Sequence, residues 1–272
     1  MKPLFHTWLR RMRGAMIRSR QDRDYQELGI VGPQKIALSL GLASICLLGT
    51  LPSRAQTPYA PGGLFVHPTA FTSRAHQFSV YAAAFTQDEQ RGINNSYYPL
   101  TLTYTPTNQL QISALAAYHQ ASDDPSHTHL GGFVKYQLVQ DTIRHPAFAI
   151  GGAYVGNDHL ESSAFAVASH AFRARGRVAT VLHLGAKWGR TKEEQGGVDD
   201  FGGFVGLQVP VAKEWDIVGE TSTRLKFDAA SASSIGFMYH NRSGVGVSLA
   251  LVNGGRSSRM KPFIGVGFLV GR

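Results

Sequence analysis

The chain has very little cysteine, because Cys46 is the only one among its 272 residues. The fold therefore cannot rely on an internal disulfide, and a zinc site built from several thiolates is excluded. Tryptophan is also scarce at three residues, whereas glycine reaches 30, phenylalanine 15 and tyrosine 10. This composition favours many strands joined by tight turns over long helices.

Long apolar runs are lacking, apart from one near the N-terminus. Residues 36–51 are uncharged and mainly apolar, follow Lys35, and precede a small-x-small site that ends at Ala55. This arrangement is typical of a secretory signal peptide, and the run is short for a membrane-spanning helix. We predict a leader with a signal helix over 1–55, cleaved near Ala55. An uncleaved N-terminal anchor helix is the alternative.

An excess of positive charge is lacking outside this leader. The formal net charge is +9, but residues 1–55 hold nine of the 27 Lys and Arg and three of the 18 Asp and Glu. The rest of the chain therefore has a net charge of only +3. We expect no nucleic-acid partner, because the basic excess lies mainly in a segment that is removed. The leader is long for a signal peptide, so both Met1 and Met16 stay open as the start.

From His76 onward the sequence has no convincing amphipathic helix. It has short segments rich in β-branched, aromatic and small residues, each followed by a break. A length of about ten residues suits a tilted strand that crosses a bilayer. The sequence predicts twelve strands, over 76–86, 96–105, 109–119, 128–139, 146–156, 161–172, 177–189, 200–209, 214–223, 233–240, 244–252 and 261–271.

The breaks between these segments alternate in length. Longer polar stretches such as 120–127 and 190–199 alternate with short turns such as 106–108 and 210–213. Long loops at one rim and short turns at the other are typical of outer-membrane barrels.

We therefore predict an all-β fold, a single antiparallel transmembrane β-barrel of about twelve strands over 76–272. A periplasmic N-terminal segment over 56–75 would precede it. The location would be the outer membrane of a Gram-negative-type bacterium. A secreted β-sandwich is the alternative, because its strands also alternate.

Alternation within the strands separates an apolar face from a more polar one. If the apolar face meets lipid, seven polar side chains face the lumen: His119, Lys135, Gln137, His183, Lys187, Asp216 and Glu220. Charged residues on an inner wall set the selectivity of a pore, but they can also pair with one another and fill a closed barrel. Twelve strands lie between filled small barrels and water-filled porins, so both possibilities stay open.

The patterns that suggest chemistry have simpler explanations. His240 and Ser243 lie close together, as in barrel lipid hydrolases, but residues three apart on a strand point to opposite faces. Asn-Arg-Ser-Gly at 241–244 is typical of a tight turn. His127 and His129 could share a strand face, yet scattered polar residues at a loop edge explain them better than a metal site. We predict no catalytic residue, metal or cofactor, and no enzymatic activity.

One local motif carries a family resemblance. Gly63-Leu64 followed by Pro68-Thr69-Ala70, with strands at 216–220 and 262–267, resembles the outer-membrane barrels of the YjbH-like group. The resemblance covers short pieces only, and this chain would match one barrel unit of such proteins. It implies a link to exopolysaccharide production or export. The chain ends in Arg272, whereas many outer-membrane barrels end in an aromatic residue.

The sequence as a whole predicts a non-enzymatic channel or export-associated barrel for polar or polysaccharide solutes. The alternatives are a closed structural or adhesive barrel that acts through its outer loops, a secreted β-sandwich, and a barrel lipid hydrolase. The expected partners are outer-membrane lipid and lipopolysaccharide, the barrel-assembly machinery, and polysaccharide or small polar solutes.

Overall fold

The computed structural model describes nine stretches of the chain: 63–88, 94–120, 126–156, 161–174, 177–193, 196–225, 231–241, 243–253 and 259–270. The predicted leader over 1–55 lies outside these residues. No helix in the described stretches is long and apolar enough to span a membrane. The strands are β1 (Gln77–Asp88), β2 (Asn94–Thr105), β3 (Leu110–Gln120), β4 (His127–Val139), β5 (Ala147–Gly156), β6 (Glu161–Ala174), β7 (Arg177–Glu193), β8 (Gly196–Ala212), β9 (Trp215–Ser222), β10 (Ser233–His240), β11 (Val245–Asn253) and β12 (Lys261–Val270).

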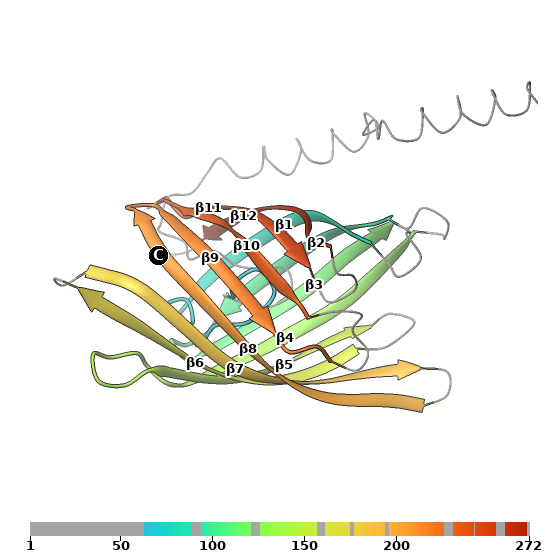
Figure 1. Ribbon diagram of the computed structural model, residues 1–272, viewed down its shortest axis with the longest axis horizontal. Helices are drawn as coiled ribbons and strands as arrows, with labels where there is room; N and C mark the ends of the chain where they lie inside the picture. Colours follow the sequence, from blue (N-terminus) through green and yellow to red (C-terminus); the bar gives the residue numbers. More distant parts are fainter. Residues whose placement is uncertain are drawn as a thin grey trace, which may run out of the picture. The chain divides into compact units, whose positions relative to one another are not determined.

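The twelve strands form one closed antiparallel barrel (Figure 1). Each strand pairs with its neighbour in sequence, and β1 pairs with β12 from Phe78 opposite Val270 to Phe85 opposite Phe263. Closure leaves no strand edge unpaired, which a sheet in a membrane requires. The predicted all-β fold, with a single barrel of about twelve strands, is confirmed.

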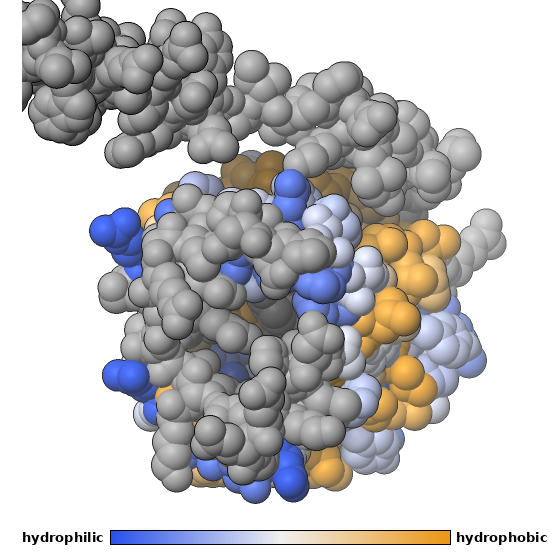
Figure 2. All heavy atoms as spheres, turned by 90° about the vertical axis from the view of Figure 1, so that its right-hand side faces the viewer, coloured by the Kyte–Doolittle hydropathy of each residue, from blue (hydrophilic) through white to orange (hydrophobic). Residues whose placement is uncertain are grey.

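The barrel has an apolar outside and a polar inside. On β3, Ile112 is 44% exposed, whereas its neighbour Ser113 is 4% exposed and lies 2.7 Å from the hydroxyl of Thr103 on β2. Apolar side chains gather on the outer wall in Figure 2. This distribution is the reverse of that in a water-soluble protein and is expected where the outer wall meets lipid. The secreted β-sandwich is therefore wrong, because there is one closed sheet and its exposed face is apolar.

The strand bounds follow the prediction closely except at β7 and β8. These strands are each 17 residues long, and they include 190–193 and 196–199 of the stretch that we expected to be a polar loop. Arg190 pairs with Asp199, and pairing continues to Glu193 opposite Gly196. Strand pairing needs only backbone groups, so polar side chains do not end it where water can solvate both faces.

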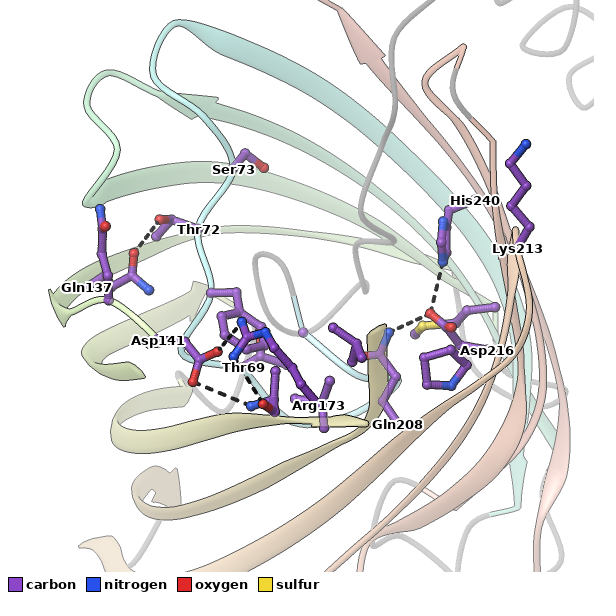
Figure 3. Close-up of a pocket in the computed structure, with 18 of the residues that line it drawn as sticks. Thr69, Thr72, Ser73, Gln137, Asp141, Arg173, Gln208, Lys213, Asp216 and His240 are labelled. Atoms are coloured by element: carbon purple, nitrogen blue, oxygen red, sulfur yellow. Dashed lines mark hydrogen bonds and ion pairs between the residues drawn. The ribbon is translucent and has the colours of Figure 1, made fainter. Parts of the chain in front are cut away.

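The described residues before β1 lie within the barrel rather than outside it. Residues 63–75, hereafter the plug, cross the lumen, and Figure 3 shows Thr69, Thr72 and Ser73 of the plug inside the wall. At His76 the backbone adopts a φ of 59°, and its N–H donates to Thr105 O as the chain turns into β1. The predicted periplasmic segment over 56–75 stays a prediction, and its residues 56–62 lie outside the described residues. Leu64, Phe65 and Ala70 of this stretch are buried, whereas Val66 and Phe71 are partly buried.

Candidate functional site

A buried carboxylate on β9 holds the first half of the plug. Glu220 Oε1 accepts hydrogen bonds from the backbone N–H groups of Phe65 at 2.8 Å and Val66 at 2.6 Å. Its Oε2 accepts the N–H of His67 at 2.9 Å and lies 2.9 Å from His67 Nδ1. The hydroxyl of Ser234, on β10, donates to Oε1 at 2.6 Å.

The backbone around Glu220 has the shape of an anion-binding nest. Leu64 N–H donates to His67 O at 2.8 Å, and Gly63 pairs with Pro68 in an isolated bridge. This tight turn directs three successive N–H groups at one carboxylate. Charge-assisted hydrogen bonds of this kind are stronger than neutral ones, and they offset the cost of burying a charge.

A buried ammonium on β4 holds the second half of the plug. Lys135 Nζ donates to Thr69 O at 3.2 Å and to Phe71 O at 2.6 Å, and the residue is 0% exposed. The plug therefore presents N–H groups to Glu220 and carbonyl oxygens to Lys135. A single short segment satisfies two wall charges of opposite sign.

Further polar contacts surround these two. Ser169 Oγ, on β6, accepts the N–H of Ala70 at 2.9 Å and lies 2.8 Å from His183 Nδ1. The Thr72 hydroxyl donates to Asn108 O at 2.5 Å and lies 3.0 Å from Gln137 Oε1. Ser169 and His183 are both 0% exposed beneath the plug. Their contact positions the plug backbone, and it is not arranged as an accessible nucleophile and base.

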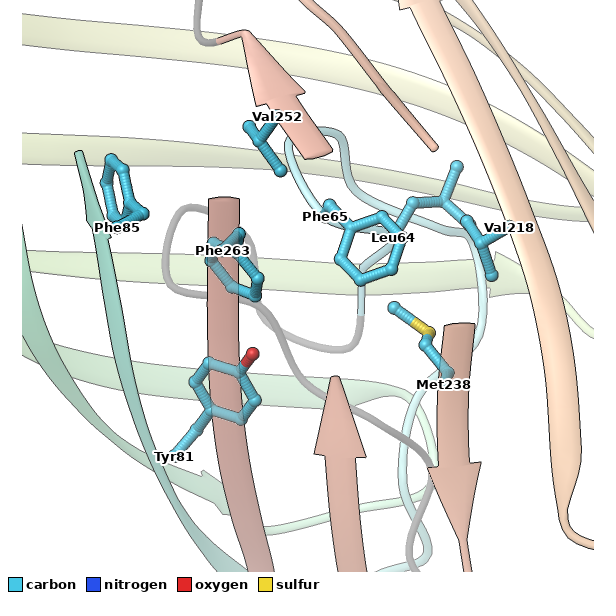
Figure 4. Packing of buried hydrophobic residues seen from close by; sticks show 8 residues of the cluster. All are labelled: Leu64, Phe65, Tyr81, Phe85, Val218, Met238, Val252 and Phe263. Carbon is cyan, nitrogen blue, oxygen red and sulfur yellow. The ribbon is translucent and has the colours of Figure 1, made fainter. Parts of the chain in front are cut away.

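Apolar packing completes the attachment. Leu64 and Phe65 lie in a cluster with Val218, Met238, Val252 and Phe263 of the wall (Figure 4). A methyl group added at Gly206 on β8 would overlap the side chain of Leu64, so this glycine makes room for the plug. The His67 ring stacks on Phe204 with centroids 4.6 Å apart.

A cavity of about 640 Å³ remains beside the plug, at the end of the barrel where the short turns lie (Figure 3). The two carboxylates in its lining have partners. Asp141 contacts Arg173 at 3.1 Å and His170 at 2.9 Å. Asp216 accepts from Gln208 Nε2 at 2.6 Å and lies 3.0 Å from His240 Nε2. The other lining cation is Lys213, and hydroxyl and amide groups of Thr69, Thr72, Ser73, Gln137 and Gln140 supply most of the remaining polarity.

The seven residues predicted to face the lumen lie in four different surroundings. Lys135, His183 and Glu220 lie beneath the plug, and Gln137 and Asp216 line the cavity. The His119 ring stacks on the ring of Tyr97, with centroids 4.5 Å apart, and on that of His129, with centroids 5.8 Å apart. Lys187 follows His183 by four positions on β7, which puts it on the same face of that strand.

Sequence reasoning missed the plug itself and the wall residues Asp141, Ser169, Arg173 and Ser234. The available signal was the apolar stretch Gly63–Ala70, which lies outside every predicted strand. Apolar side chains need burial even there, so the stretch had to pack against the barrel.

No metal or catalytic arrangement emerges in the described stretches. They contain no group of three or more His, Cys, Asp or Glu that could hold a metal ion. Ser243 Oγ donates to Asn241 Oδ1 at 2.7 Å, whereas His240 contacts Asp216. The site offers hydrogen-bond donors and acceptors on a polar wall. Such groups can bind and pass a polar chain.

No family model matches the chain, and no curated protein matches it. The resemblance to the YjbH-like group is therefore not supported by any family model. Among solved structures, the fold is similar to the KdgM porin, with a TM-score of 0.51, 12% identity, and coverage of 70% of this chain and 98% of that one. The KdgM porin in complex with disordered oligogalacturonate has a TM-score of 0.52 and 11% identity, with coverage of 70% of this chain and 98% of that one. An outer membrane channel from Pseudomonas putida F1 has a TM-score of 0.49 and 9% identity, with coverage of 74% of this chain and 97% of that one. At such identities the likeness to the two KdgM porin structures shows the fold alone, which is that of an outer-membrane porin-like barrel.

Proposed function

We propose that this protein is a non-enzymatic outer-membrane channel for polar solutes, including polysaccharide chains, and that residues 63–75 close its lumen. One observation carries the proposal. The plug is attached to a polar wall mainly by side-chain hydrogen bonds from Glu220, Lys135 and Ser169, and not by strand pairing. Contacts of this kind can be exchanged for contacts with a solute without opening the barrel.

The size of the plug supports a polymeric solute. In a filled small barrel the wall side chains themselves occupy the interior. Here the wall contributes small residues opposite the plug, such as Ala147, Ala149 and Gly206, and a polypeptide turn occupies the space. A lumen that holds a folded-back peptide also has room for an unbranched polar chain. The KdgM porin, a barrel of similar fold, has been solved in complex with disordered oligogalacturonate, which supports a saccharide chain as solute.

The same plug favours a second candidate, the closed structural barrel that acts through its outer loops. A plug that never leaves would make the barrel a rigid support. The two candidates differ in one measurable property, because only the channel passes ions or solutes when the plug is released.

Conductance of the purified full chain in planar bilayers tests the proposal. We expect a low conductance for the native protein and a clearly higher one for the variant with Glu220→Ala and Lys135→Ala. A variant with Ala70→Cys and Ser169→Cys, in a Cys46→Ser background, provides the locked control. It should stay closed when oxidised and behave like the native protein when reduced. If the released variant passes no current, the channel is wrong and the closed barrel is favoured.

We further propose that a signal peptide is removed near Ala55, that the barrel-assembly machinery inserts the protein beside lipopolysaccharide, and that its solute is linked to exopolysaccharide export. The sequence of the leader and the resemblance to the YjbH-like group support these points. Intact mass of the membrane-extracted protein tests the cleavage. A mature chain that begins at residue 56 agrees with it, and a chain that retains residues 36–51 contradicts it.

A further inference from the structure

We infer that the channel binds an uncharged, hydroxyl-rich chain, a neutral oligosaccharide or polysaccharide, which takes over the hydrogen bonds that the plug makes with Glu220 and Lys135. This inference rests on the proposed function and names the substrate class of the same lumen. It comes from what each wall group requires of whatever lies against it.

Glu220 requires donors. Three backbone N–H groups, the His67 ring and the Ser234 hydroxyl surround its carboxylate, and four of these five belong to the plug. When the plug leaves, only the wall's own Ser234 remains from this set. A buried carboxylate without donors is costly, so a solute that passes Glu220 binds well only if it donates.

Lys135 requires acceptors. Its ammonium donates to the carbonyl oxygens of Thr69 and Phe71, and both of these leave with the plug. Ammonium groups are donors only, so acceptors on the solute can take the place of these two carbonyls. The lumen therefore requires a donor at one wall and an acceptor at the other, from the same occupant.

Few polymers supply both kinds of group without charge. A peptide backbone does so with N–H and C=O, which is how the plug fits. Sugar hydroxyls do so because each one both donates and accepts. A polyanionic saccharide would satisfy Lys135 but would bring carboxylates toward Glu220, and like charges at close range repel. A polycation would meet the same penalty at Lys135.

The cavity beside the plug agrees with a neutral chain. Its two carboxylates, Asp141 and Asp216, already have hydrogen-bonding partners on the wall. Its two basic side chains, Lys213 and Arg173, equal the carboxylates in number. Among the described lining residues, Lys and Arg do not outnumber the carboxylates that would repel an acidic polymer. The hydroxyl and amide groups of Thr72, Gln137 and Gln208 are typical partners of sugar hydroxyls.

Competition with the plug tests the inference on the full chain. Ala70 N lies 2.9 Å from Ser169 Oγ, so cysteines at these positions, in a Cys46→Ser background, report whether the plug is seated. The rate at which an added oxidant forms the disulfide is measured with no saccharide, with malto-oligosaccharide, with oligogalacturonate and with chitosan oligosaccharide. We expect the neutral sugar to slow the reaction about tenfold at about ten times its dissociation constant. The two charged polymers should have little effect.

Two controls make the result specific. Thr103→Cys with Ser113→Cys joins paired residues of β2 and β3 within the wall, so no saccharide should alter its rate. Glu220→Gln keeps the size of the side chain but removes its charge, so oligogalacturonate should now compete. Slowing by oligogalacturonate in the chain with native Glu220, at least equal to that by the neutral sugar, would overturn the inference. Slowing by none of the three would overturn it as well.

Failure of the inference about the substrate class is distinguishable from failure of the proposed function. If the Glu220→Ala, Lys135→Ala variant conducts but the neutral sugar does not compete with the plug, the channel stands and the substrate class is wrong. If that variant does not conduct, the channel itself is wrong, whatever the sugars do.

Discussion

Glu220 and Lys135 act on opposite polar groups of the same short segment. Glu220, on β9, accepts the N–H groups of Phe65 and His67, whereas Lys135, on β4, donates to the carbonyl oxygens of Thr69 and Phe71. The plug is thus fastened at two points on different walls of the barrel. Both wall groups are buried, so each depends on the plug for much of its hydrogen bonding.

Replacing Glu220 by Ala should release the first half of the plug. The three N–H groups would lose their acceptor, and each buried unpaired donor costs about 1–3 kcal/mol. Release of this part of the plug into water therefore becomes favourable. We expect faster chymotrypsin cleavage within 63–75, measured by intact mass over time, while the barrel keeps its heat-modified shift on a gel. The Glu220→Gln variant should be intermediate, because an amide oxygen still accepts. An Ala variant as resistant to cleavage as the native chain would contradict this role.

Replacing Lys135 by Met should release the second half. Met retains much of the apolar stem but cannot donate to Thr69 O and Phe71 O, so both carbonyls lose the hydrogen bond from Lys135. We expect faster hydrogen exchange at residues 69–73, measured by mass spectrometry. Lys187→Met is the matched control, because Lys187 lies on the same face of β7 as His183 but is only half-buried. An equal effect of both variants would show that general loss of charge matters and that the contact does not.

The barrel was predictable from the sequence because its signals are repeated. Each strand contributes a run of residues that fit a pleated sheet, and the turns between strands carry Asn, Gly, Pro and Ser. The inward direction of Lys135 and Glu220 follows from alternation alone, since neighbours on a strand face apart. The prediction was wrong at the ends of β7 and β8, whose polar residues resemble a loop but pair as strand.

The plug was not predictable in the same way. Nothing in Leu64, Phe65 or Ala70 repeats, and these residues form no strand whose period could be recognised. Their burial depends on distant partners, such as Glu220, which lies 155 positions after Phe65. Contacts of that sequence separation are set by closure of the barrel. The donors and acceptors of the site therefore become visible only when the walls are assembled around the segment.

Enlarging Gly206 should expel the plug by a steric route that leaves every charge in place. A Cβ at this position would overlap the side chain of Leu64, and filling a packed site beyond its volume costs about 1–3 kcal/mol. We expect Gly206→Ala to raise bilayer conductance and protease sensitivity of 63–75. Leu64→Ala in the same chain should restore both toward native values, because it returns the lost space. If the double variant is as open as the single one, the overlap is not the cause.

A charge added to the outer wall should be costly, which tests whether that face meets lipid. Leu184, on β7, is 60% exposed on the apolar outer wall, next to the inward-facing His183. An arginine in the lipid-facing band of a barrel costs about 2–4 kcal/mol at the bilayer midplane, so Leu184→Arg should lower the unfolding free energy in lipid by up to that amount. Leu184→Ala separates lost apolar area from added charge and should cost less. Unfolding in guanidinium, followed by tryptophan fluorescence in lipid vesicles, gives the comparison. Equal losses for Arg and Ala would mean that Leu184 does not face lipid.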